Sequence, residues 1–60
     1  MEFIIEKTMP QGYYKVVGRY KTFDDASNAL EKIKSDLRHE IWCDDWVNTK
    51  FGYAPLAWIN

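Results

Sequence analysis

Cys43 and His39 are the two side chains of this sequence whose types could support nucleophilic catalysis. A cysteine becomes a nucleophile when a neighbouring histidine favours its thiolate form. A helix would place these residues, four positions apart, on one face, whereas a strand would not bring them together. Asp44 and Asp45 follow directly and disfavour a negatively charged thiolate. We therefore interpret Cys43 as a small buried thiol beside a surface histidine.

The sequence contains no other familiar catalytic or metal-binding pattern. A single cysteine excludes an intrachain disulfide, and one cysteine with one histidine cannot supply the usual tetrahedral set of zinc ligands. Gly12, Gly18 and Gly52 stand apart from one another and form no phosphate-binding loop. Ser27 and Ser35 have no base near them in the sequence. We expect no metal, no cofactor and no enzymatic activity.

Two adjacent aspartates, Asp44 and Asp45, are flanked by two tryptophans, Trp42 and Trp46. The simplest interpretation is a solvated turn. Metal-binding or catalytic roles are minor alternatives, because a chain of this size has little room for a cleft that perturbs carboxylate pKa values. The main functional alternative is a patch that docks on a basic protein partner, since aromatic residues are typical interface anchors. These four residues are the candidate protein-binding site.

A second candidate surface combines aromatic and basic side chains at alternate positions: Tyr13, Lys15, Arg19 and Lys21. Single-stranded nucleic acids bind to stacking platforms of this composition. The residues match no recognised RNA-binding signature, and an ordinary solvated strand face or a site for an acidic protein are the alternatives. Binding of single-stranded nucleic acid through these four residues is therefore the second functional hypothesis, after protein binding.

Size and composition set the remaining bounds. The chain of 60 residues forms a single domain (1–60) with a net charge of −1, which argues against sequence-independent nucleic-acid binding over a large basic surface. A domain this small needs dense packing or self-association, so we expect the aromatic residues to form much of the core and a homodimer is possible. The start of the chain lacks the features of a signal peptide and no apolar run could span a bilayer, which predicts a cytoplasmic location.

The first half of the chain has the pattern of a β-hairpin. Residues 2–7 favour a strand, and Met9-Pro10-Gln11-Gly12 fits a type I turn. Residues 13–21 alternate as a second strand with its uncharged even-numbered positions facing the core and its basic odd-numbered positions facing water. Gly18 in the middle of this strand predicts a bulge or a close approach of the helix.

An amphipathic helix is predicted from Phe23 to Leu37. Thr22 is a good N-cap, and Asp24 and Asp25 suit the positive end of the helix dipole. The apolar residues then recur at the spacing of one buried helical face: Ala26, Ala29, Leu30, Ile33 and Leu37. This pattern accounts for both aspartates without a function.

The last third of the chain leaves one alternative open. Residues 41–43 are favoured as a short strand, followed by a turn at 44–45 and an extended piece at 46–47, because β-branched and aromatic residues dominate. The alternative is a helix over residues 40–47, which would place Trp42 and Trp46 on one face. Residues 53–59 form a final strand with Ala54, Leu56 and Trp58 on one face, and Pro55 places this strand at an edge of the sheet.

The predicted fold is therefore α+β in the order β-β-α-β-β, an antiparallel sheet with one helix packed on a face. No motif-level family match supports a function. Short, tryptophan-rich α+β proteins are common among accessory proteins of bacteriophages and mobile elements, which bind and inhibit or modulate a host protein. We expect a non-enzymatic protein-binding module of this general type.

Overall fold

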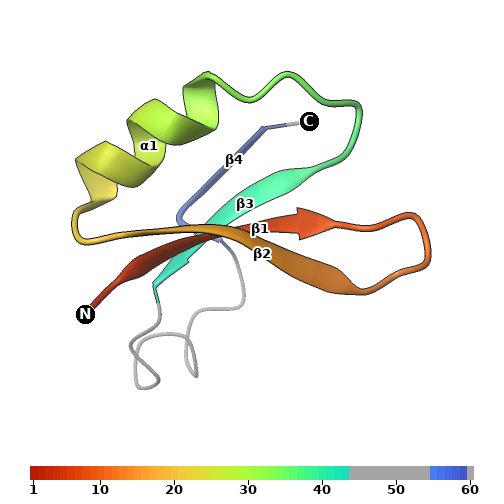
Figure 1. The fold of residues 1–60 in the computed structure, drawn as a ribbon, viewed down its shortest axis with the longest axis horizontal. Helices are drawn as coiled ribbons and strands as arrows, with labels where there is room; N and C mark the ends of the chain where they lie inside the picture. Colours follow the sequence, from red (N-terminus) through yellow and green to blue (C-terminus); the bar gives the residue numbers. More distant parts are fainter. Residues whose placement is uncertain (44–54, 60) are drawn as a thin grey trace.

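The computed structural model describes residues 1–43 and 55–59 and arranges them as one antiparallel sheet with a helix on one face (Figure 1). The elements follow the order β1 (Phe3–Thr8), β2 (Tyr14–Tyr20), α1 (Phe23–Glu31), β3 (His39–Cys43) and β4 (Ala57–Ile59). The strand order across the sheet is β2-β1-β3-β4. The predicted fold class is confirmed.

The turn between β1 and β2 closes as the sequence predicts. The Gly12 N–H donates to the Met9 carbonyl (2.9 Å), and the Met9 N–H donates to the Tyr13 carbonyl (2.8 Å). Gly12 has φ +97°, a left-handed conformation that glycine adopts without strain. Pro10 suits the position after Met9 because its fixed φ matches a type I turn.

A β-bulge in β2 changes which side chains share a face. Ile5 pairs with Gly18, but Glu6 pairs with Val16, so Val17 is an extra residue in β2. Gly18 leaves room for the Tyr20 ring, because a Cβ atom here would lie 2.8 Å from the hydroxyl of Tyr20 and displace the end of that side chain. The predicted bulge is confirmed, whereas the predicted division of 13–21 into one core face and one solvent face is wrong: the alternation reverses at the bulge.

The helix begins as predicted and ends earlier. The Thr22 hydroxyl accepts from the Asp25 N–H (3.1 Å), which confirms the N-cap. α1 ends at Glu31, not at Leu37. Its last turn tightens into i→i+3 bonds, with the Ile33 N–H donating to the Leu30 carbonyl (3.1 Å). Residues 32–38 connect α1 to β3, which starts at His39. A helix that continued to residue 37 would leave too few residues to lead the chain back to the sheet.

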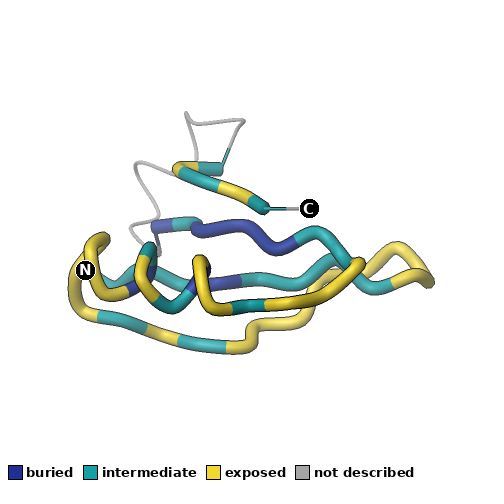
Figure 2. The backbone as a smooth tube through the Cα atoms, turned by 90° about the horizontal axis from the view of Figure 1, so that it is seen from above, coloured by how far each residue is buried: buried dark blue, intermediate teal, exposed yellow. Residues whose placement is uncertain are grey.

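The core lies between α1 and the middle of the sheet, and it is aliphatic. Ile5, Ile41, Ala26 and Leu30 are buried there. The partly buried residues packed around them are Phe3, Tyr20, Ala29, Ile33, Ala57 and Ile59. Figure 2 shows that burial is concentrated along β3. Of the aromatic residues that the structure describes, Phe3 and Tyr20 pack against this core as expected, whereas Tyr13, Tyr14, Phe23 and Trp58 are exposed.

The favoured strand at residues 41–43 is confirmed and lies within β3. Residues 40–43 belong to β3, and 44–47 lie outside the described residues. β4 is an edge strand, as Pro55 predicts, but it begins at Ala57, and Tyr53 and Ala54 lie outside the described residues. The Leu56 N–H leads into it by donating to the Ile41 carbonyl (2.9 Å).

Candidate interaction surface on the open face of the sheet

The face of the sheet opposite α1, which we call the open face, has a charged centre. Directly paired residues on neighbouring strands point to the same side. One row runs through all four strands in register: Val16 on β2, Glu6 on β1, Glu40 on β3 and Trp58 on β4. Two carboxylates therefore lie side by side at the centre, between a valine and a tryptophan at the edges.

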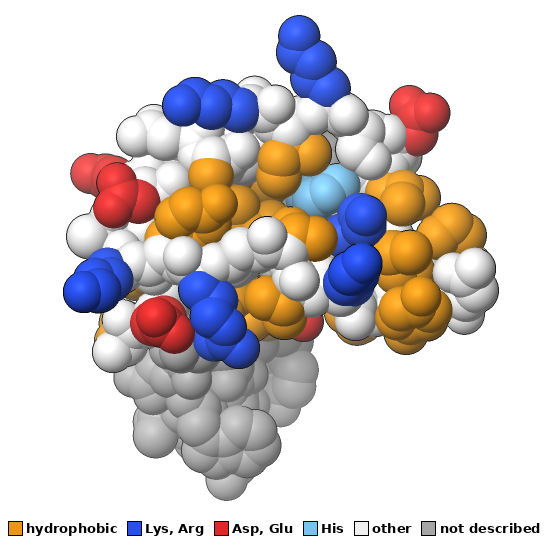
Figure 3. Space-filling view, in the orientation of Figure 1, with side chains coloured by type: hydrophobic (Ala, Val, Ile, Leu, Met, Phe, Trp, Pro, Cys, Tyr) orange, Lys and Arg blue, Asp and Glu red, His pale blue; other side chains and the backbone are white. Residues whose placement is uncertain are grey.

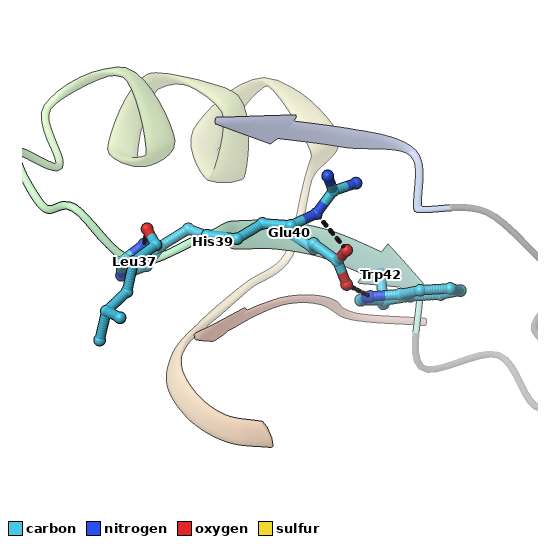
Figure 4. Close-up of polar contacts among 5 residues, drawn as sticks. Leu37, His39, Glu40 and Trp42 are labelled. Carbon is cyan, nitrogen blue, oxygen red and sulfur yellow. Dashed lines mark hydrogen bonds and ion pairs between the residues drawn. The ribbon is translucent and has the colours of Figure 1, made fainter. Parts of the chain in front are cut away.

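Glu40 is the best-satisfied polar group of this face. Only 7% of the residue is exposed, and its carboxylate accepts two hydrogen bonds from neighbours on the same side of β3 (Figure 4). Arg38 Nε donates to Oε2 (2.7 Å), and Trp42 Nε1 donates to Oε1 (2.9 Å). Burying a carboxylate is costly unless donors compensate, so these two bonds hold all three side chains in defined positions.

Arg38 extends this arrangement to the edge of the sheet. Its guanidinium carbon lies 5.0 Å from the centre of a Trp58 ring, a cation–π distance. Trp58 itself is 55% exposed. Trp42, Glu40, Arg38 and Trp58 thus form a continuous chain of contacts, which we call the Trp–Glu–Arg–Trp network. It holds two indole rings on either side of an ion pair.

Glu6 is the less stabilised carboxylate of the central pair. Partial burial and, second, the charge of the facing Glu40 raise the pKa of Glu6 above its ordinary value of 4.5. Both effects penalise its ionised form. The ionised form of Glu6 is therefore destabilised at the centre of the open face, and a positively charged neighbour would reduce this destabilisation.

Of the candidate protein-binding residues, the structure describes Trp42 and places it in the network. Asp44, Asp45 and Trp46 lie outside the described residues. Sequence reasoning missed Arg38, Glu40 and Trp58 as site residues. The signal for the first two was the alternation of 38, 40 and 42 along a strand, which a helix extended to residue 37 obscured.

The four residues of the alternative nucleic-acid site do not share one face. The reversal at the bulge leaves Lys15 opposite Lys7 on the helix side and Arg19 opposite Ile4 on the open face. Arg19 also forms an exposed ion pair with Glu2 (3.4 Å). Tyr13 lies in the turn and Lys21 beyond the end of β2, so the single stacking platform predicted from the sequence is not assembled.

Cys43 and His39 are not brought together. Both lie on the helix side of β3, and four strand residues separate their backbones by about 13 Å. The expected surface position of His39 is wrong: only 4% of the residue is exposed, and its Nδ1 donates to the Leu37 carbonyl (2.9 Å). Cys43 is buried, as expected.

Three comparisons with known proteins gave no relative. A scan against protein-family models, a search of curated proteins and a search of solved structures each returned no match. Among residues 1–43 and 55–59, no group of His, Cys, Asp and Glu is arranged to hold a metal ion. The described helix is too short to cross a membrane.

Proposed function

We propose that this protein is a non-enzymatic protein-binding module that docks through the open face of its sheet. The observation that carries the proposal is the position of Trp58, which is 55% exposed and stacked on Arg38, while Arg38 is fixed by buried Glu40. Tryptophan and arginine dominate the energetics of protein interfaces, particularly when neighbouring contacts hold them in place beforehand.

The rest of the open face supports the same function. Exposed apolar side chains surround the charged centre, with Tyr14 and Val16 on one edge strand and Leu56 before the other. Large apolar groups at the edges with a fixed ion pair between them suit a protein surface. They offer no nucleophile and no activated base for a reaction. Binding would modulate or inhibit the partner by covering part of its surface.

The partner that we favour is another protein, and a second copy of this chain is a competing occupant. A pull-down from the native cell extract with the tagged chain tests the proposal. Trp58→Ala should lose the captured protein, because it removes the exposed anchor. Tyr13→Ala removes an exposed aromatic side chain from the hairpin turn and serves as the matched control, which should retain the captured protein.

Two results would oppose this proposal. Equal capture by a folded Trp58→Ala variant would remove the open face as the binding site. Sedimentation that shows a dimer of the wild-type chain and a monomer of Trp58→Ala would assign the face to self-association instead.

A further inference from the structure

The outer edge of β2 presents backbone groups that the proposed function, which relies on side chains of the open face, leaves unused. β2 stands at the end of the strand order, so alternate residues direct their backbone N–H and C=O groups away from β1. It has seven residues, whereas β4 at the opposite edge has three. β2 is therefore the longer template for an added strand.

The side chains of this edge are apolar and basic. Tyr14, Val16 and Val17 are between 41% and 58% exposed. Figure 3 shows hydrophobic side chains gathered over the end of the β1–β2 hairpin with basic side chains beside them. From position 13 to position 23 the sequence has no acidic residue, and its charges are those of Lys15, Arg19 and Lys21.

One pair on the hairpin is unfavourable for the fold itself. Lys7 and Lys15 face each other directly across β1 and β2. Like charges in this position destabilise a sheet. Among the described residues, neither lysine lies within ion-pair distance of a carboxylate. An anionic group bound beside β2 would neutralise this repulsion.

We propose that the outer edge of β2 binds an extended acidic segment of another protein, which adds to the sheet as a fifth strand. The backbone groups of β2 supply the pairing, while Lys15, on the helix side, selects for carboxylates on that side of the added strand. Tyr14 and Val16, at alternate positions on the open face, contact apolar side chains of the added strand. This partner surface is distinct from the Trp–Glu–Arg–Trp network.

A second copy of this chain fits the edge poorly. Full-length antiparallel pairing of two β2 strands is centred on Val17 and places Lys15 opposite Arg19 at both ends. The bulge and the lysine are also devices that discourage pairing between identical edges. The bulge weakens pairing with any added strand, whereas the lysine opposes only a basic strand and favours an acidic one.

A polypeptide fits the edge better than a nucleic acid does. The pairing groups of a strand repeat at about 3.3 Å per residue, the repeat of an extended peptide backbone. Stacking platforms for nucleic acids need aromatic rings beside basic groups on one face, and the bulge separates Lys15 from Arg19.

The test uses the full chain and a fluorescent peptide that alternates glutamate with valine, followed by anisotropy. Wild-type protein should bind it, with amide NMR shifts centred on β2. Lys15→Glu should weaken binding at least about tenfold, because charge complementarity is reversed beside the added strand. This variant should stay folded, since a carboxylate at that position would face Lys7 favourably.

Matched controls separate this site from the other surface and from charge alone. Lys34→Glu alters an exposed lysine beyond the helix and should leave binding within about twofold of wild type. Trp58→Ala should bind the peptide normally even if it loses the protein partner of the open face. An acidic peptide with proline in place of alternate valines cannot pair along its length and should bind weakly.

Four results would overturn the proposal. They are equal binding of the proline-containing peptide, no binding of the alternating peptide, tighter binding of oligothymidylate than of the peptide, and self-association of the wild-type chain with amide protection along β2.

Discussion

Adjacent residue pairs of β1 and β3 lie on opposite faces of the sheet, and they differ in burial and in charge. On the face beneath α1, Ile5 of β1 pairs with Ile41 of β3, and both are almost fully buried. One residue further along β1, Glu6 pairs with Glu40 on the open face. The first pair packs on Ala26 and Leu30 of α1, whereas the second repels across the strands and depends on Arg38 for compensation.

This difference teaches where the stability and the binding capacity of the molecule lie. The aliphatic face gains free energy from burial and presents nothing to a partner. The open face places charged residues at its centre and a mostly exposed tryptophan at an edge, so it buries less apolar surface than the aliphatic face and depends on the hydrogen bonds of Glu40. Exposed aromatic side chains held in place in this way are the feature on which the proposed binding function rests.

The largest effect should come from truncating the buried aliphatic pair. Ile41→Ala leaves a cavity beneath α1 and should cost about 2–5 kcal/mol in free energy of unfolding. That is close to the whole stability of a domain this size, so Ile41→Val, at about 0.5–1.5 kcal/mol, gives the measurable version in urea. Val16→Ala on the open face is the control and should change stability by less than about 0.5 kcal/mol. Similar losses at both positions would remove the distinction between the faces.

Much of the covered face was predictable from the sequence because short-range rules specify it. The N-cap at Thr22 and the helical spacing of Ala26, Leu30 and Ile33 depend only on residues that are close together in the sequence. The end of α1 was not predictable in this way. Leu37 fits the apolar period, but the geometry of the return to β3 determines where the helix stops, and that is a property of the whole sheet.

The open face was less predictable because one local irregularity alters its register. Gly18 indicates a bulge, but the consequence is long-range: the extra residue Val17 reverses the alternation and separates Lys15 from Arg19. Trp42 was identified from the acidic and aromatic composition of its segment. Its partner Glu40 lies two residues away on the same strand, but Trp58 reaches Arg38 and Glu40 only through the pairing of β3 with β4, which single-sequence patterns do not reveal.

The second-largest effect should come from removing the carboxylate that organises the open face. Glu40→Ala leaves the Arg38 guanidinium and the Trp42 N–H without their acceptor and should cost about 1–3 kcal/mol, measured by urea unfolding. Glu40→Gln keeps an acceptor oxygen and should cost less. If Glu40→Ala is as stable as wild type, the hydrogen bonds do not hold the network together.

A smaller effect on folding, with a large one on binding, is expected at Trp58. Because the ring is mostly exposed, Trp58→Ala should lose about 1 kcal/mol of stability or less, chiefly its cation–π contact with Arg38. Its affinity for a protein partner should fall by about 2 kcal/mol or more. Titration calorimetry and urea unfolding of one variant separate the two quantities. A stability loss as large as that of Ile41→Ala would place Trp58 in the core.

The smallest effect concerns how pH changes the contribution of the facing carboxylates Glu6 and Glu40 to stability. Since burial and Glu40 raise the pKa of Glu6 above 4.5, the folded chain binds this proton more tightly than the unfolded chain does. The stabilising contribution is complete below pH 4.5 and is lost as the pH rises through the raised pKa. Glu6→Gln removes the charge, so at neutral pH the variant should be more stable than wild type by about 0.2–1 kcal/mol.

This advantage should shrink as the pH falls through the raised pKa of Glu6 and should be lost below pH 4.5, where wild-type Glu6 is itself uncharged. Urea unfolding of both proteins across the acidic range measures it, and Asp36→Asn, at an exposed carboxylate away from the sheet, supplies the control for net charge. A difference between Glu6→Gln and wild type that does not change with pH would mean that the repulsion between Glu6 and Glu40 is absent. The open face would then differ from the covered face in shape and polarity but not in electrostatic cost.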